Sequence, residues 1–350
     1  MTEMSRQVEF HTEHWPLRAP FRIAGRTFTQ TSVVHVVVYQ GGRKGHGEGA
    51  GVYYHGETPE TMLEQLRGVA EQLVAEGLDR RTLQRVLPPG GARNAMDCAL
   101  WDLEAQSTGR SAREVAGVQE LLPLVTTFTL SADDPEIVAR AARHFAAARA
   151  LKLKLAGDEL DIERVRAARS ARPDVWLSVD ANEAFDVQAL MRLVPALVDN
   201  DVRLIEQPLP AGRDCALCEL DLPIPLAADE SVQCAADIPS LVGLYDMVNI
   251  KLDKCGGLTE ALEMARLARR FGLDLMVGNM CGTSLAMAPA CVLGQLCDVV
   301  DLDGPMLLAS DRQPALMYRN GTIEGCEQVW GAQTSAAQQS AAHRSGARLS

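Results

Sequence analysis

From about residue 123 onward, the chain alternates short aliphatic runs with segments of helical spacing. Successive runs start roughly 22–27 residues apart, the spacing of repeated strand–helix units. We expect strands at 125–130, 151–155, 175–180, 202–206, 224–229, 247–252, 273–278 and 297–303. Eight such units predict an α/β fold, a modified (β/α)8 barrel in which the last helix is altered, that is, (β/α)7β. A doubly wound open sheet is the structural alternative.

Residues 1–120 have a different pattern. They contain a strand-like run at 32–39, a glycine-rich stretch at 41–51 (GGRKGHGEGAG) that we interpret as a turn, and helical material from about 59 to 108. A chain of 350 residues has room for a barrel and a smaller partner. We therefore predict an α+β domain at 1–120 and a barrel at 121–309. The polar, low-complexity tail at 331–350 is predicted to be disordered.

Composition narrows the classes of partner. The net charge is −12 and the chain has no basic cluster, which argues against nucleic acid. The uncharged stretch 275–297 is interrupted by glycine, proline, asparagine and glutamine, so we interpret it as a buried strand, loop and helix, not a membrane span. The nine cysteines are scattered, and only Cys215 and Cys218 form a C-x-x-C pair. With no apolar leader at the N-terminus, we expect a reduced cytoplasmic protein.

Lysine is rare and unevenly placed. Only five of the 34 basic side chains are lysines, and four of them form two pairs, Lys152 with Lys154 and Lys251 with Lys254. Each pair adjoins a predicted strand, the second and the sixth. A buried amine can accept a proton, whereas arginine cannot at accessible pH. The pairs therefore predict acid/base chemistry from two sides of one site, although a role as salt-bridge partners is the alternative.

Three carboxylates end three consecutive predicted strands: Asp180 in DAN, Glu206 in EQP and Asp229 in ADES. Active sites of barrels form at the C-terminal ends of the strands, so these acids should converge. Three like charges in a dry pocket require a cation, and an all-oxygen set favours Mg²⁺ over Zn²⁺. The alternative is that each acid caps a helix. Asp301 and Asp303 follow the eighth run and alternate, so both should face the barrel mouth.

These motifs together resemble the enolase superfamily, in its muconate-lactonizing-enzyme subgroup. The resemblance covers about residues 8–330 and includes GHGEGAG (45–51), ARNAMDCALWDLEAQSTGR (92–110), the K-x-K, DAN, EQP and ADES segments, and NIKLDKCGGL. It implies an N-terminal capping domain, completed by the segment 310–330. It also implies a Lys base with Mg²⁺. The implied roles are Mg²⁺ ligands for Asp180, Glu206 and Asp229, two bases in Lys154 and Lys251, and neutralisation of the substrate carboxylate by Lys152.

Within the subgroup, MVGNMCGTSLAMAPA (276–290) and DLDGPMLL (301–308) look most like the dipeptide epimerases. This resemblance implies proton transfer at the α-carbon of a dipeptide's C-terminal residue, through an enediolate, and a homo-oligomer. Asp301 and Asp303 would hold the substrate ammonium, and Thr127 would contact substrate. The segment 20–30 would be a mobile specificity loop. There Arg26 would pair with an acidic side chain and Arg22 is a second candidate, unless both are surface arginines.

Five alternatives remain. Inside the subgroup, an N-succinylamino-acid racemase, an o-succinylbenzoate synthase or a cycloisomerase would share the lysines and acids, but their substrates carry no free ammonium for Asp301 and Asp303. A barrel aldolase would use one lysine as a Schiff base. A binding protein without catalysis would need no opposed lysines.

Overall fold

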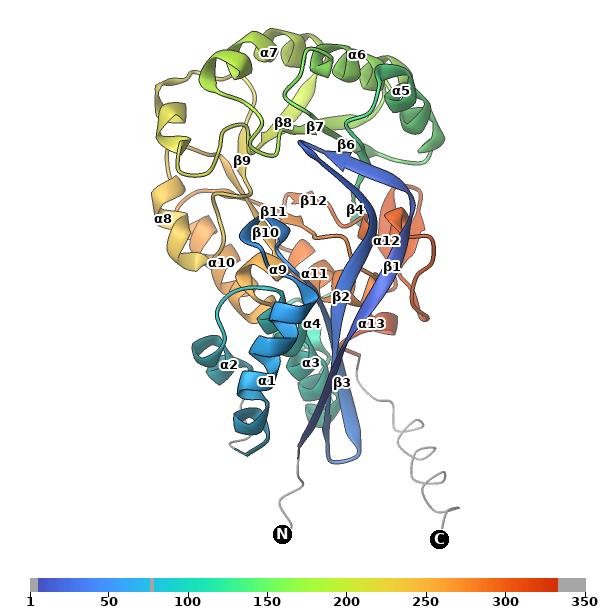
Figure 1. The fold of residues 1–350 in the computed structure, drawn as a ribbon, viewed down its shortest axis with the longest axis vertical. Helices are drawn as coiled ribbons and strands as arrows, with labels where there is room; N and C mark the ends of the chain where they lie inside the picture. The colour runs from blue at the N-terminus through green and yellow to red at the C-terminus, as the bar shows by residue number, and fades with distance from the viewer. Residues whose placement is uncertain (1–5, 76–78, 333–350) are drawn as a thin grey trace.

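The computed structural model describes residues 6–75 and 79–332, and Figure 1 shows two parts, a barrel and a cap. Eight parallel strands form one nearly closed sheet in chain order, which confirms the predicted barrel. The strands are β5 (Thr127–Leu130), β6 (Ala150–Lys154), β7 (Trp176–Asp180), β8 (Val202–Glu206), β9 (Leu226–Ala228), β10 (Met247–Lys251), β11 (Asp274–Gly278) and β12 (Val299–Val300).

Helices follow most strands and cover the outside of the barrel (Figure 1). The long ones are α5 (Pro135–His144), α6 (Asp161–Ala171), α7 (Val187–Asp199), α10 (Leu258–Arg270) and α11 (Ser284–Gly294). Shorter elements follow β8, β9 and β10: η2 (Asp214–Glu219), η3 (Ala235–Asp237), α8 (Ile238–Leu241) and α9 (Leu252–Cys255). After β12 comes only the four-residue α12 (Gly304–Leu307), so the eighth helix is reduced as predicted.

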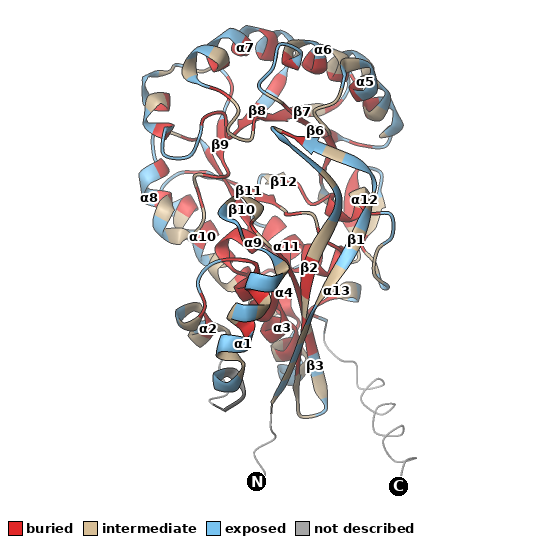
Figure 2. Ribbon diagram, in the orientation of Figure 1, coloured by how far each residue is buried: buried red, intermediate tan, exposed pale blue. Residues whose placement is uncertain are grey.

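The uncharged stretch at 275–297 consists of β11, a loop and α11. Every residue of α11 is buried, which explains why the sequence there carries no charge. Buried residues follow the barrel strands and the helix faces that pack on them (Figure 2). Among the described residues, no helix is both long enough and apolar enough to cross a bilayer.

The two end strands of the sheet are joined by side chains, at what we call the seam. Thr126 Oγ1 accepts a hydrogen bond from Leu302 N at 3.0 Å. Asp303 Oδ2 accepts one from Thr129 N at 2.6 Å, and Thr127 Oγ1 donates to Asp301 Oδ1 at 2.5 Å. The eighth strand is shorter than predicted, because β12 ends at Val300 and the residues after it bond to β5 through side chains.

The capping domain begins with an antiparallel sheet of β1 (Gln7–Ile23), β2 (Arg26–Gln40) and β3 (Arg43–Ala50). The segment expected to be a loop at 20–30 is the end of the β1–β2 hairpin, where Ile23 pairs with Arg26. It extends over the barrel mouth (Figure 1). The helices α1 (Pro59–Ala75), α2 (Arg80–Val86) and α3 (Gly91–Thr108) follow, joined to the sheet by η1 (Tyr53–His55).

The prediction of a turn throughout 41–51 was wrong. The turn is confined to two glycines with positive φ at 41 and 42, and residues 43–50 form β3. Alternate glycines of β3 lie against α3: a Cβ on Gly45, Gly47 or Gly49 would come within 2.2 Å of a carbonyl oxygen of that helix. Glycine therefore serves here to let the helix backbone approach the strand closely.

The C-terminal segment contacts both parts. β13 (Met317–Arg319), β14 (Thr322–Glu324) and β4 (Leu124–Val125) form a small sheet, and α13 (Cys326–Val329) follows. Trp330 Nε1 donates to the carbonyls of His46 and Cys98, at 3.0 and 3.1 Å. The completion of the cap by 310–330 and the predicted domain boundaries stay predictions. Most of the tail predicted to be disordered, 333–350, lies outside the described residues.

Candidate active site

Three buried carboxylates meet at the C-terminal ends of adjacent strands. Asp180 ends β7, Glu206 ends β8, and Asp229 follows β9 directly. Their side chains are at most 1% exposed, and one oxygen from each lies within 4.8 Å of the others. The structure thus brings together the acidic triad expected from the sequence, because equivalent positions in successive strand–helix units meet at one end of the barrel.

The donor set of the triad suits a hard divalent cation. All the ligand atoms offered are carboxylate oxygens. Glu206 Oε1 accepts a hydrogen bond from Asn249 Nδ2 at 2.9 Å, and the buried Oε2 lies 2.8 Å from Lys152 Nζ. Burial and the negative charge of Asp180 raise the pKa of Glu206 to about 8. A bound cation would stabilise the ionised form of this buried carboxyl group.

Lys152 supplies positive charge at the centre of the triad. Its Nζ lies 3.0 Å from Asp180 Oδ2, 2.8 Å from Glu206 Oε2 and 2.8 Å from Asp301 Oδ2. Burial opposes ionisation of the amine, but the surrounding carboxylates, Asp180 first, hold the pKa of Lys152 well above its ordinary value. Lys152 is therefore an ammonium, suited to neutralising anionic groups and unsuited to accepting a proton.

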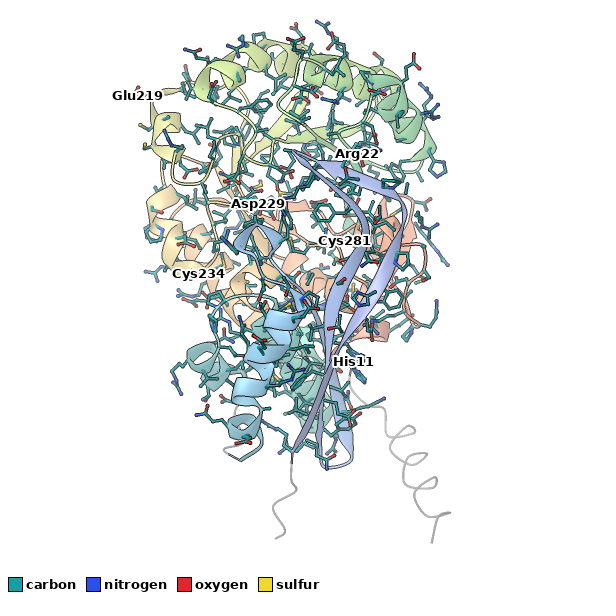
Figure 3. The ribbon with its side chains drawn as sticks, in the orientation of Figure 1. His11, Arg22, Glu219, Asp229, Cys234 and Cys281 are labelled. Carbon is teal, nitrogen blue, oxygen red and sulfur yellow. The ribbon has the colours of Figure 1, made fainter. Side chains whose placement is uncertain are left out.

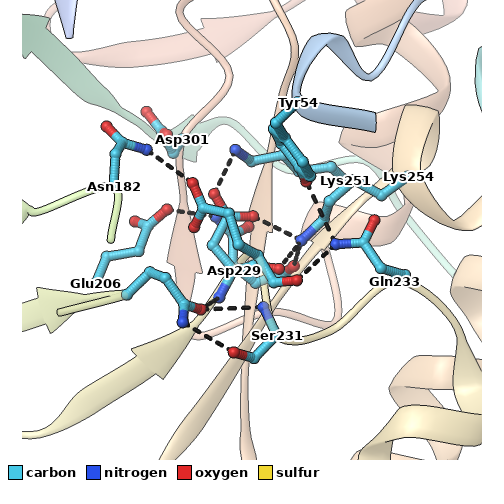
Figure 4. Close-up of polar contacts among 12 residues, drawn as sticks. Tyr54, Asn182, Glu206, Asp229, Ser231, Gln233, Lys251, Lys254 and Asp301 are labelled. Carbon is cyan, nitrogen blue, oxygen red and sulfur yellow. Dashed lines mark hydrogen bonds and ion pairs between the residues drawn. The ribbon is translucent and has the colours of Figure 1, made fainter. Parts of the chain in front are cut away.

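Lys154 and Lys251 flank the triad from two different strands. Lys154 Nζ lies 2.6 Å from Asp180 Oδ2 and 3.1 Å from Asn182 Oδ1. Lys251 Nζ lies 2.6 Å from Asp229 Oδ2 (Figure 4). Burial lowers the pKa of Lys251, but the charge of Asp229 outweighs burial and keeps the pKa of the amine well above normal. A cation that neutralised Asp229 would remove this effect.

Lys254 differs from Lys251 in the contacts of its amine. Its Nζ donates to Asp229 Oδ1 at 2.6 Å, and to the carbonyls of Asp229 and Asn249 at 2.5 and 3.0 Å. Burial lowers the pKa of Lys254 below its ordinary value, although the charge of Asp229 opposes this effect. Three acceptors thus hold this amine against the far oxygen of Asp229.

A cavity of about 270 Å³ lies between the cap and the barrel mouth. Its polar side includes Lys154, Lys251, Asn182 and Glu230, and its apolar side is formed largely by Phe21, Ile23, Phe28, Tyr53 and Tyr54 of the cap. Both lysines thus face one enclosed volume, close to the roughly 300 Å³ at the lower end of small-molecule pockets.

The sequence-predicted contacts Asp301, Asp303 and Thr127 lie together at the seam. Asp301 is occupied on both oxygens, by Lys152 and by Thr127. Asp303 precedes α12, but its side chain makes no cap bond and accepts from Thr129 N instead. Burial and the charge of Asp301 raise the pKa of Asp303 to about 7. Their role toward an ammonium stays a prediction.

The two arginines near the hairpin end have different surroundings. Arg22 Nη1 pairs with Asp133 Oδ1 at 2.5 Å, so its charge is engaged by the loop between β5 and α5. Arg26 is exposed, and its guanidinium lies 4.8 Å from the ring centre of Tyr53, which lines the cavity. Of the two, Arg26 is adjacent to the cavity wall. Its pairing with an acidic substrate stays a prediction.

The EQP and ADES motifs contain two further residues of the site, for which the sequence indicated no function. Gln207 of EQP has a left-handed φ of 35°, and its Oε1 accepts from Asp229 N at 2.8 Å and Ser231 N at 3.1 Å, which positions the loop after β9. Glu230 of ADES lines the cavity and accepts from Asn182 Nδ2 at 3.1 Å. The signal for both was their place beside a metal-ligand candidate, but their contacts depend on neighbouring strands that no single motif specifies.

Comparisons with known proteins extend over both parts of the chain. Residues 5–117 match the mandelate racemase / muconate lactonizing enzyme N-terminal domain, and residues 136–328 match the enolase C-terminal domain-like family. The L-Ala-D/L-Glu epimerase of Escherichia coli K12 is 42% identical over 320 residues, 91% of this chain and 99% of that protein. The N-acetyl-D-glutamate racemase of a Pseudoalteromonas species is 39% identical over 277 residues, 79% of this chain and 87% of that protein.

A solved structure has a fold similar to that of this chain. It is an enolase family member from Agrobacterium tumefaciens with homology to dipeptide epimerases, described with bound sodium and L-Ala-L-Glu. It is 40% identical, with a TM-score of 0.90, and the match covers 93% of this chain and all of that one. Because the two family models match residues 5–117 and 136–328, most of the sequence, this chain belongs to the mandelate racemase/muconate lactonizing enzyme group of the enolase superfamily.

Proposed function

We propose that this protein is a Mg²⁺-assisted dipeptide epimerase, an isomerase that inverts the α-carbon of a dipeptide's C-terminal residue. One observation carries the proposal: Lys154 and Lys251 line the same cavity from β6 and β10. Three strands separate β6 from β10 in the eight-stranded sheet, so the two amines approach from opposite sides of the barrel. Inversion at carbon needs proton transfer on both faces, which this arrangement supplies.

The metal would be held by Asp180, Glu206 and Asp229. Magnesium prefers oxygen ligands, and a triad without histidine or cysteine suits it better than zinc. When bound, Mg²⁺ supplies the positive charge that these carboxylates otherwise draw from the lysines, and it stabilises negative charge on the substrate carboxylate.

The side chains then perform the proton transfers. A neutral amine, Lys154 or Lys251, takes the α-proton from one face and becomes an ammonium, while the electron pair of the broken C–H bond moves into the enediolate. Lys152 neutralises part of the enediolate's charge where it develops. The opposite lysine, already an ammonium, returns a proton to the other face and becomes neutral. The reverse reaction exchanges the two roles, and the apolar wall of the cap excludes water from the enediolate.

The dipeptide as substrate is supported by Asp301 and Asp303. Both acids are buried; Asp301 pairs with Lys152, and Asp303 accepts from Thr129 N. A substrate ammonium would be a suitable partner for the negative charge that Lys152 leaves unneutralised. The second candidate is an N-acylamino-acid racemase, which the similarity to the N-acetyl-D-glutamate racemase favours. It would use the same lysines and metal ligands but no ammonium contact.

Two further proposals concern the setting of the enzyme. We place it in the cytoplasm, because its nine cysteines are all free, as in a reducing compartment. We also expect a homo-oligomer, which the size distribution of the purified protein in solution would test.

The function is tested by incubating the enzyme in D₂O with a library of L,L-dipeptides, L-Ala-L-Glu included, and following mass and chiral composition. The expected result is one deuterium per turnover at the C-terminal α-carbon together with formation of the L,D epimer. Removal of Mg²⁺ by chelation should stop both, and Mg²⁺ addition should restore them. The Asp229→Asn variant should lose both and should not recover with Mg²⁺. Full turnover after exhaustive chelation would contradict the proposal.

A further inference from the structure

A second cluster of ligand-type side chains lies on the sheet of the capping domain, outside the barrel site. His11 and Glu13 are two residues apart on β1, so their side chains share one face. His35 on β2 is paired directly with His11. One ligand atom from each of the three lies within 4.8 Å of the others. Figure 3 shows His11 far down the hairpin from Asp229.

We propose that His11, Glu13 and His35 form a binding site for a transition-metal ion of the zinc class, separate from the magnesium site. Two imidazoles and one carboxylate are a donor set that zinc and its neighbours bind. The barrel triad offers oxygen alone and suits magnesium. The two sites therefore select different ions.

The spacing of the ligand atoms fits a tetrahedral ion. Glu13 Oε1 lies 3.1 Å from His11 Nε2 and 3.4 Å from His35 Nδ1. Ligand bonds of about 2.0–2.2 Å in a tetrahedron put neighbouring ligand atoms about 3.3–3.6 Å apart. The two distances to Glu13 are close to this range, and the ligand atoms of His11 and His35 lie within 4.8 Å of each other. The side chain of His11 is 57% exposed, which leaves room for a water as the fourth ligand.

The outer contacts hold two of the ligands in the orientation that binding needs. His35 Nε2 lies 3.1 Å from His46 Nδ1, so the ring can donate on that side and offer Nδ1 to the ion. Glu13 Oε2 accepts from Arg312 Nη2 at 2.5 Å, and this contact fixes the carboxylate with Oε1 near the histidines. Arg312 Nη1 also donates to Oε1, at 3.3 Å, and an ion bound at Oε1 would replace this longer contact. Such supporting hydrogen bonds fix the ring orientation and tautomer of metal-binding histidines.

The local charge also suits a cation. Arg312 is the nearby positive group, and it is shared between Glu13 and the fully buried Glu48, whose Oε2 lies 2.9 Å from Arg312 Nε. Two carboxylates and one guanidinium leave one negative charge beside the histidines. A divalent ion would therefore meet a favourable field at this face of the sheet.

The test uses the full chain saturated with Mg²⁺, so that the barrel triad is occupied, and measures Zn²⁺ binding by competition with a chromophoric chelator. His11→Gln and His35→Gln should each weaken binding of one Zn²⁺ equivalent at least about 100-fold, and His46→Ala should weaken it about 10–100-fold. His14→Gln is the matched control. It changes the next histidine of β1, which faces Ser32 on the other side of the sheet, and should bind as the wild type does.

Co²⁺ separates this site from the exposed pair Cys215 and Cys218, which could also take a soft ion. Cobalt bound by imidazole and carboxylate gives visible d–d bands without the intense near-ultraviolet band of a thiolate ligand. The expected spectrum is the former, lost in His11→Gln and His35→Gln. Unchanged Zn²⁺ affinity in both variants, or a thiolate band that accounts for all the bound cobalt, would overturn the proposal. Neither result would affect the proposed epimerase, which requires only the barrel site.

Discussion

Lys152 Nζ lies 2.8 Å from Asp301 Oδ2, while Thr127 donates to the other oxygen of the same carboxylate. Asp301 thus connects the acidic triad to the seam of the barrel. It faces a lysine before any substrate enters, so a substrate ammonium would have to share this carboxylate with Lys152. Asp303 accepts one hydrogen bond on Oδ2, from the backbone amide of Thr129, and its carboxylate can accept further hydrogen bonds.

We therefore expect the free amine of the substrate to contribute to turnover. Blocking it by acetylation should lower kcat/KM for L-Ala-L-Glu about 5–150-fold, the effect of about 1–3 kcal/mol for leaving a buried polar group without its partner. Steady-state kinetics on the free and acetylated dipeptide would measure this, with N-acetyl-glutamate as a comparison. If acetylation leaves kcat/KM unchanged or raises it, the N-acylamino-acid racemase becomes the better assignment.

Loss of either flanking lysine should prevent epimerisation. In Lys154→Ala and in Lys251→Ala, we expect conversion between epimers to fall by at least about 10²–10⁴-fold, because one face then has no acid or base. Each variant should still exchange the α-proton of one epimer with D₂O, and the two variants should prefer opposite epimers. NMR of the exchange in both epimers measures this. A Lys251→Ala enzyme that epimerises at a near wild-type rate would refute the assignment and make Lys254 the candidate base.

Magnesium binding should depend on pH through Glu206. Its pKa of about 8, raised by burial and by Asp180, means that it holds a proton at pH 7 when no cation is bound. Binding must release that proton, so the apparent affinity should rise about tenfold per pH unit below 8 and level off above it. Lysines hold the pKa values of Asp180 and Asp229 below normal against the effect of burial, so neither contributes in this range.

Calorimetry at pH 7, in two buffers with different ionisation enthalpies, should detect at least close to one proton released per Mg²⁺, because Glu206 gives up its proton and neutralisation of Asp229 also favours proton loss from Lys251. The same titrations from pH 6 to 9 would give the affinity profile. An affinity that is flat between pH 6 and 8 would mean that Glu206 is already ionised without the metal.

Arg26 is expected to tune the choice of side chain at the C-terminal residue. In Arg26→Ala, the ratio of kcat/KM for acidic over neutral dipeptides should fall roughly tenfold, because an arginine–carboxylate pair is lost. Arg22→Ala is the matched control: it removes a neighbouring arginine of the same hairpin that pairs with Asp133, and it should leave the ratio unchanged. An unchanged ranking in Arg26→Ala would show that the preference is set elsewhere.

The barrel and its acids could be predicted from the sequence because both depend on a regular repeat. Asp180, Glu206 and Asp229 each follow an aliphatic run, and parallel strands bring such positions to one end. β3 was missed because glycine usually weakens strands. Its glycines are explained only by α3, about fifty residues further along, whose carbonyls leave no room for a Cβ.

Other features depend on contacts across the fold that no local pattern encodes. The sequence indicated that Lys152 would help to neutralise charge, but its position among Asp180, Glu206 and Asp301 requires strands β6, β7 and β8 and the seam together. The cavity also depends on contacts between distant parts of the chain. The cap supplies much of its apolar wall from the β1–β2 hairpin, which the sequence indicated only as a loop.

The seam has a consequence for how variants of this enzyme are interpreted. Elsewhere around the barrel, backbone ladders hold neighbouring strands and tolerate exchange of a side chain. Between β5 and the segment after β12, hydrogen bonds through side chains hold the chain together. Two of these side chains are the acids proposed to bind the substrate ammonium. Removing Asp303 would leave Thr129 N without its acceptor. At this one edge, the proposed recognition of the substrate ammonium would use the same carboxylates that hold the two end strands together.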